Sequence, residues 1–97
     1  TAPSEEKVSY LEKKQSAAML RKLRAKLRDT ERKIEQTEEQ ISDLDQEMLK
    51  PENYTSASAY AKLETQKKEA EDALNLLYEA WEAQSAELEQ AESTEHE

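Results

Sequence analysis

The 97-residue sequence contains no glycine, no cysteine and no phenylalanine. Tight hairpin turns, strand bulges and loops that cradle phosphate nearly all use glycine, so its absence argues against β-hairpins and excludes a phosphate-binding catalytic loop. The absence of cysteine excludes a disulfide framework and any zinc site with thiolate ligands, which fits an intracellular protein.

Long apolar stretches are also missing. No run approaches the ~20 apolar residues that cross a bilayer, and no segment resembles a signal peptide. Only 35% of the residues are hydrophobic, so the chain has too little apolar material for a large globular core. We therefore expect one small domain, cytoplasmic and without a membrane segment.

The residues that dominate instead are strong helix formers: Ala, Leu, Glu, Gln, Lys and Arg. This composition is typical of long helices and coiled coils. A chain with 38% charged residues is also compatible with disorder, and hydrophobic periodicity distinguishes the two.

The first half of the chain carries a heptad stripe. Ser9 and Glu12 have the spacing of a capping box, which marks a helix start. Residues on alternating steps of three and four then form an a/d pattern over four heptads: Leu20, Leu23, Leu27, Thr30, Ile34, Thr37, Ile41, Leu44 and Met48.

The stripe stops at "LKPENYTSAS", residues 49–58, where Pro51 cannot continue a helix interior and restricts Lys50. A second stripe follows: Tyr60, Leu63, Lys67, Ala70, Leu74, Leu77, Trp81, Gln84, Leu88 and Ala91. The pattern predicts an all-α antiparallel two-helix coiled-coil hairpin with helices at about 9–49 and 56–91. Residues 1–8 are expected to be a flexible linker, 9–91 the hairpin domain, and 92–97 a disordered tail.

Pairing a positions of one stripe with d positions of the other gives one register, centred between Thr55 and Ser56 in the expected turn. The pairs are Met48 with Leu63, Leu44 with Lys67, Ile41 with Ala70, Thr37 with Leu74, Ile34 with Leu77, Thr30 with Trp81, Leu27 with Gln84, and Leu23 with Leu88. In this register Trp81 is a packing residue opposite a small side chain, and base stacking is the alternative role for its ring. Tyr78 is expected to pack near Glu31 with its hydroxyl at the surface.

Charge is unevenly distributed along the chain. The net charge is −9, but residues 7–33 hold ten Lys and Arg against three acids, whereas residues 34–97 hold four against eighteen. Most bases of the first segment fall outside the a/d stripe, so they face solvent or a partner. The candidate nucleic-acid-binding residues are Lys13, Lys14, Arg21, Lys22, Arg24, Lys26, Arg28, Arg32 and Lys33.

The functional interpretation of this segment is a contact surface for a phosphate backbone, which needs positive charge but no sequence reading. The alternative is that the charge serves solubility. Lys26 and Glu87 nearly face each other across the stripe, so part of the charge is expected to be neutralised within the hairpin.

Catalytic chemistry has little support in the sequence. The single histidine, His96, lies in the expected tail and is interpreted as solvated. Carboxylate pairs on helix surfaces without a cleft support neither acid–base catalysis nor a metal site. We expect no catalytic residue, no cofactor-binding residue and no metal ligand in this chain, and therefore no enzyme.

Three short stretches carry a resemblance: "KVSY" at residues 7–10, "PENY" at 51–54 and "LYEAWE" at 77–82. In order and spacing they resemble landmarks of the carboxyl-terminal coiled-coil domain of ABC-F ATPases, the group that includes Uup. The resemblance covers roughly residues 7–90.

The resemblance implies that the chain ends a longer protein with two ATP-binding cassettes, which would bind ATP and Mg²⁺. It implies a cytoplasmic, non-catalytic arm acting on DNA or on ribosomal RNA and the ribosome, beside its own cassettes, and we expect a monomeric hairpin. Two alternatives stay open. The hairpin could be a structural spacer or protein-interaction arm, or its polar stripe residues could favour self-association.

Overall fold

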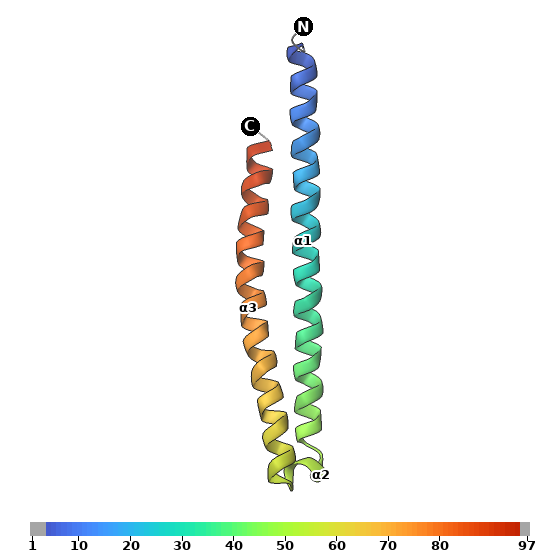
Figure 1. Ribbon diagram of the computed structural model, residues 1–97, viewed down its shortest axis with the longest axis vertical. Helices are drawn as coiled ribbons and strands as arrows, with labels where there is room; N and C mark the ends of the chain where they lie inside the picture. Colours follow the sequence, from blue (N-terminus) through green and yellow to red (C-terminus); the bar gives the residue numbers. More distant parts are fainter. Residues whose placement is uncertain (1–3, 96–97) are drawn as a thin grey trace.

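The computed structural model describes residues 4–95 and consists of two long helices packed side by side (Figure 1). Helix α1 spans Glu5–Met48, the single-turn helix α2 spans Pro51–Tyr54, and α3 spans Ala57–Glu95. Helices α1 and α3 run antiparallel and give the hairpin extents of 79 × 18 × 17 Å. The predicted all-α antiparallel hairpin is confirmed.

Helix α1 begins earlier than the capping box predicts. Ser4 has extended backbone angles and its side chain accepts a hydrogen bond of 3.2 Å from the Lys7 amide, so Ser4 is the N-cap. Glu5 and Glu6 follow in the first turn, where negative charge complements the helix dipole. The start predicted at Ser9 is wrong by one turn, because Ser4 offers the same cap ahead of two favourable acids.

The ends of the chain differ accordingly from the predicted boundaries. Residues 5–8, assigned to the linker, belong to α1, and α3 continues past residue 91 to Glu95. Residues 1–3 and 96–97, with His96 among them, lie outside the described residues. A flexible linker and a disordered tail at these positions stay predictions.

The turn is closed by residues of the "PENY" stretch. Lys50 is extended and Pro51 occupies the first position of α2, as the restriction before proline requires. The Asn53 side-chain amide donates to the Glu47 carbonyl oxygen at 2.7 Å and so satisfies an end of α1 that lacks a helical partner. The Ser56 side chain accepts from the Ala59 amide at 3.3 Å and caps α3.

The core is a narrow seam between α1 and α3. The residues buried in it all belong to the predicted stripes: Leu20, Leu23, Thr30, Ile34 and Ala70. The other stripe residues are half-buried, except Trp81, which is exposed. The heptad pattern therefore identified the packing face of both helices.

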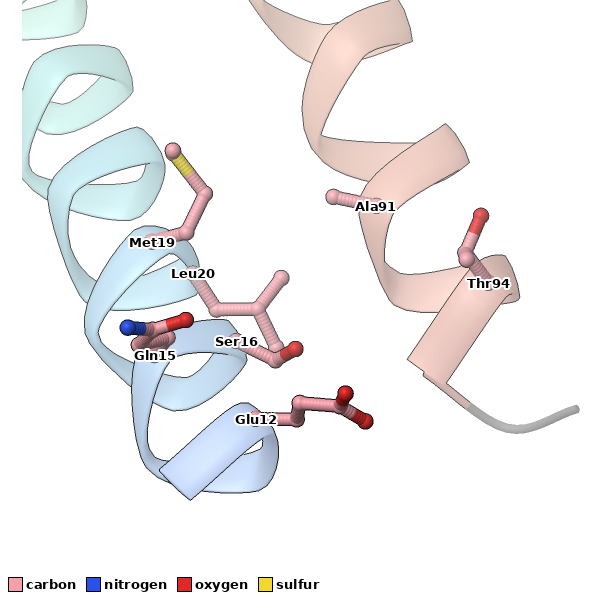
Figure 2. Close-up of a pocket in the computed structure, with 7 residues that line it drawn as sticks. All are labelled: Glu12, Gln15, Ser16, Met19, Leu20, Ala91 and Thr94. Carbon is pink, nitrogen blue, oxygen red and sulfur yellow. The ribbon is translucent and has the colours of Figure 1, made fainter. Parts of the chain in front are cut away.

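The two helices differ in where they end. Near the open end of the hairpin, Leu20 of α1 and Ala91 of α3 line the same groove from opposite sides (Figure 2). These two residues therefore lie at the same level along the two helices. The first turns of α1 extend beyond the described end of α3 (Figure 1). We call this part of α1, residues 5–15, the projecting segment. Among residues 4–95 no helix has the length and apolarity that a membrane span requires.

Candidate nucleic-acid interface

One flank of the seam carries a row of three α1 carboxylates, each seven residues apart and each bound to α3. Glu31 accepts the Trp81 indole N–H at 3.3 Å, and Glu38 accepts the Tyr78 hydroxyl at 3.2 Å. The third, Asp45, lies 2.6 Å from the Lys67 ammonium. Because the spacing is one heptad, all three carboxylates lie on the same side of α1. We call Glu31, Glu38 and Asp45 the carboxylate row.

Trp81 lies at the edge of the seam and not inside it as predicted. Its side chain is 36% exposed and lines a shallow hollow with Ile34, Glu31 and Tyr78. The N–H of a partly buried indole usually has a hydrogen-bond acceptor, and for Trp81 this acceptor is the Glu31 carboxylate beside the seam. The aromatic pair of "LYEAWE" therefore closes the side of the hairpin.

Thr30 forms a polar contact with Gln84, which the register places one layer further along the seam from Trp81. Thr30 is 6% exposed, and its hydroxyl oxygen lies 2.7 Å from Gln84 Oε1 and 3.1 Å from the Lys26 carbonyl oxygen. Buried polar groups require partners, and the contact with Gln84 supplies one for the Thr30 hydroxyl within the seam.

Tyr78 also differs in detail from the prediction. Its hydroxyl donates to Glu38, one heptad beyond the expected neighbour Glu31. Partial desolvation of the phenol raises the pKa of Tyr78, and the nearby Glu38 charge and hydrogen bond raise it further. The neutral phenol is thus the form that fits this flank.

Lys67 occupies a seam position but places its ammonium at the surface. The ammonium lies 2.6 Å from Asp45 and 4.0 Å from Glu71, so it separates two carboxylates. The hydrogen bond to Asp45 is the main cause that raises the pKa of Lys67, and the charges of Asp45 and Glu71 add to it. A lysine in the stripe is tolerated because its stem packs while its charge is bound at the flank.

The nine candidate residues for nucleic-acid binding are all exposed along α1. They do not converge on one point but spread over the outer surface of the helix. Four bases of α1 recur seven residues apart, one of which, Lys7, was not among the nine. We call them the basic line: Lys7, Lys14, Arg21 and Arg28. At 1.5 Å per residue the basic line is about 32 Å long.

Two of the nine bases are held by carboxylates of the hairpin. Arg24 lies 3.7 Å from Glu92 of α3, and Lys33 lies 3.3 Å from Asp29 one turn earlier. Both pairs are about half-exposed, so they hold the side chains weakly. The predicted pairing of Lys26 with Glu87 does not form an ion pair. Within residues 4–94 no carboxylate lies in ion-pair distance of Lys14, Arg21, Lys22, Arg28 or Arg32.

The side of α3 that faces away from α1 is acidic at the same level. Glu79, Glu82 and Glu89 are exposed and fall outside the stripe of α3. Since the hairpin is only 17 to 18 Å across, a polyanion meets attraction on the α1 side and repulsion on the α3 side. The charge distribution thus orients any anionic partner toward the outer face of α1.

The described residues offer little for catalysis. No cluster of three or more His, Asp or Glu among them has the arrangement of a metal site. The groove at the open end has a volume of about 590 Å³ and is lined by uncharged side chains together with Glu12. The absence of a catalytic role stays a prediction.

The family model described as the ABC transporter C-terminal domain matches residues 7–86. The chain belongs to this family. The match contains all of "KVSY", "PENY" and "LYEAWE", so the three stretches that carried the resemblance lie within this ABC transporter C-terminal domain. No curated protein and no solved structure that was compared matches the chain significantly.

Within this ABC transporter C-terminal domain the three stretches now have structural positions. Lys7 and Tyr10 lie on the projecting segment, Asn53 closes the turn, and Tyr78 and Trp81 bind the carboxylate row. The contacts of "PENY" in the turn and of "LYEAWE" with the carboxylate row give these two stretches a role in stabilising the hairpin. Among residues 4–94, the first stretch forms no hydrogen bond or ion pair with α3.

Proposed function

We propose that this hairpin is the C-terminal arm of a Uup-like ABC-F ATPase and binds the phosphate backbone of DNA or ribosomal RNA through the outer face of α1. In the whole protein, the cassettes would bind ATP and Mg²⁺, and the arm would act in the cytoplasm on nucleic acid or the ribosome.

The observation that carries the proposal is the basic line. Its four side chains are exposed on one side of a continuous helix, spaced about 10.5 Å apart. Each Lys or Arg that reaches a phosphate releases condensed counterions, which supplies affinity without reading sequence. Lys22 and Arg32 widen the positive surface beside it.

Contact with the phosphate backbone is favoured over base reading because the part of α1 that packs against α3 presents no aromatic side chain for stacking. Between Ser16 and Glu35, the described part of α1 carries no aromatic side chain. Trp81 and Tyr78 of α3 are committed to Glu31 and Glu38 on the flank. A surface of Lys and Arg without stacking groups positions a duplex by its phosphates and gives little sequence preference.

The hairpin is proposed to act as a monomer. The seam is filled by residues of both helices, and no buried side-chain polar atom among the described residues lacks a hydrogen-bond partner. Of the polar stripe residues that favour self-association, Thr30 and Gln84 contact each other within one chain, and the Thr37 hydroxyl donates to the Lys33 carbonyl oxygen. A second copy is therefore not needed to complete the core.

The test is a titration of this chain with duplex DNA and with structured RNA at increasing salt. We expect micromolar or weaker binding whose affinity falls steeply with salt, at a slope set by the number of phosphates contacted. Undetectable binding to both at low salt would contradict the proposal. A partner protein that co-purifies after complete nuclease digestion would instead support the spacer or protein-interaction alternative.

A further inference from the structure

The projecting segment of α1 carries an exposed aromatic ring at Tyr10. Its side chain is 64% exposed, compared with 56% for Tyr54, 41% for Tyr78 and 36% for Trp81. None of the described residues forms a hydrogen bond to the Tyr10 hydroxyl, whereas Tyr78 and Trp81 both donate to the carboxylate row.

The position of Tyr10 explains this exposure. Leu20 and Ala91 face each other, so Glu95, four residues later in α3, lies level with Ser16 of α1. Tyr10 is six residues further out, about 9 Å beyond that level. The described residues of α3 therefore all lie below the level of the ring, which leaves the ring exposed.

The charged neighbours of Tyr10 are mainly basic. Lys7, Lys13 and Lys14 lie one turn away from it on the helix surface, and Glu6 is the one acid at this distance. Tyr10 lies between Lys7 and Lys14, two members of the basic line. Its setting differs from that of Tyr54, which follows Glu52 in the turn at the opposite end of the hairpin.

We infer that Tyr10 is a stacking site for an unpaired base of the nucleic acid held along α1, an inference that rests on the proposed function. An aromatic face stacks on any base, so the contact needs no sequence preference, and flanking lysines hold the phosphates of the same strand. Paired bases within a duplex do not expose their faces. The partner that uses both features is a duplex with a single-stranded extension, whose paired part lies along Arg21 and Arg28.

The experiment compares the binding of this chain to a blunt duplex and to the same duplex with a four-nucleotide single-stranded extension. A base stacked on an aromatic side chain contributes about fivefold or more in affinity, so the extended duplex should bind at least about fivefold more tightly. Tyr10→Ala should abolish this ratio and leave blunt-duplex affinity unchanged. Tyr10→Phe should keep the ratio, because it keeps the ring.

Tyr54→Ala is the matched control, since it removes a similarly exposed tyrosine away from the basic line. A fluorescent adenine analogue in the extension adds a direct signal: its emission should be quenched by the wild type and Tyr10→Phe but not by Tyr10→Ala. Circular dichroism should show equal melting temperatures for all four proteins, as the rings are exposed.

The outcomes separate the two proposals. Equal affinity for blunt and extended duplex, unchanged by Tyr10→Ala, would overturn the stacking inference and leave the backbone proposal standing. No binding to either duplex at low salt would remove both. An effect of Tyr10→Ala on melting temperature alone would assign the ring to packing against protein and would also overturn the inference.

Discussion

The ammonium of Lys67 lies 2.6 Å from the carboxylate of Asp45, although the heptad pattern places Lys67 in the apolar seam. The contact joins α3 to α1 near the turn. The Lys67 charge also reduces the repulsion between the carboxylates of Asp45 and Glu71. It belongs to a side of the hairpin on which Glu31 and Glu38 are also bound by side chains of α3.

The first prediction concerns alkaline pH. The pKa of Lys67 is raised in the folded state, chiefly by the Asp45 hydrogen bond, and that of Tyr78 is raised, chiefly by desolvation. A raised pKa contributes stability that is complete below the unfolded-state value and is lost as the pH rises through the folded-state value. We therefore expect melting temperatures to fall above about pH 10, near the ordinary pKa values of tyrosine and lysine.

The double variant Lys67→Met with Tyr78→Phe should flatten this alkaline decline in melts followed by circular dichroism between pH 8 and 12. Lys68→Met is the control, because Lys68 lies on the outer surface and contacts Asp72 only at 3.7 Å. A decline of the same size in the double variant would show that the flank contacts do not couple folding to pH.

The second prediction concerns the partly buried pair Thr30 and Gln84. Thr30→Val leaves the half-buried Gln84 amide without its partner and should cost about 1 to 3 kcal/mol of unfolding free energy in urea titrations. Gln84→Leu should cost less, because the Thr30 hydroxyl keeps the Lys26 carbonyl as acceptor. The double variant, apolar on both sides, should recover much of the loss, and strict additivity would argue against the pairing.

The third prediction concerns the position of Trp81. With a ring 36% exposed, its fluorescence should be partly accessible to a neutral quencher, and denaturation should increase that access. Trp81→Phe should cost less than about 1 kcal/mol, since the lost hydrogen bond to Glu31 is at the surface. Full quencher access in the folded protein would contradict the flank position, as would complete protection.

The fourth prediction concerns the turn. Asn53→Ala removes the side-chain donor to the Glu47 carbonyl oxygen and should cost about 1 kcal/mol. Thr55→Ala, which changes a neighbouring side chain bonded only within its own turn, is the control and should cost less. Equal losses in urea titrations would indicate that Asn53 does not close α1.

The sequence predicted the fold because a two-helix hairpin is specified by a one-dimensional pattern. The three-four stripes locate the packing face, and Pro51 marks the turn. The helix start was missed because Ser4 and Ser9 both offer a cap, and the choice between them depends on Glu5 and Glu6. The spacing of the stripe residues does not decide which of the two serines is the N-cap.

The contacts of Trp81 and Tyr78 with the carboxylate row could not be predicted from a register that pairs only the stripe residues. Trp81 contacts Glu31 from the edge of the seam, and Tyr78 contacts Glu38 from beside it. The direction of each side chain depends on which acceptors lie within reach in three dimensions. The exposure of the basic residues was predictable from their heptad positions. That Lys26 has no ion pair with Glu87, while Arg24 pairs with Glu92, required the structure.

The measurement that tests the central claim most directly is the salt dependence of duplex binding by two variants with equal changes in net charge. Arg21→Glu with Arg28→Glu reverses two members of the basic line, whereas Lys62→Glu with Lys68→Glu reverses two exposed bases of α3. We predict that the first variant loses most of its affinity and lowers the slope of log K against log salt by about 2. The second should keep the wild-type slope, and equal losses in the two variants would contradict binding through the outer face of α1.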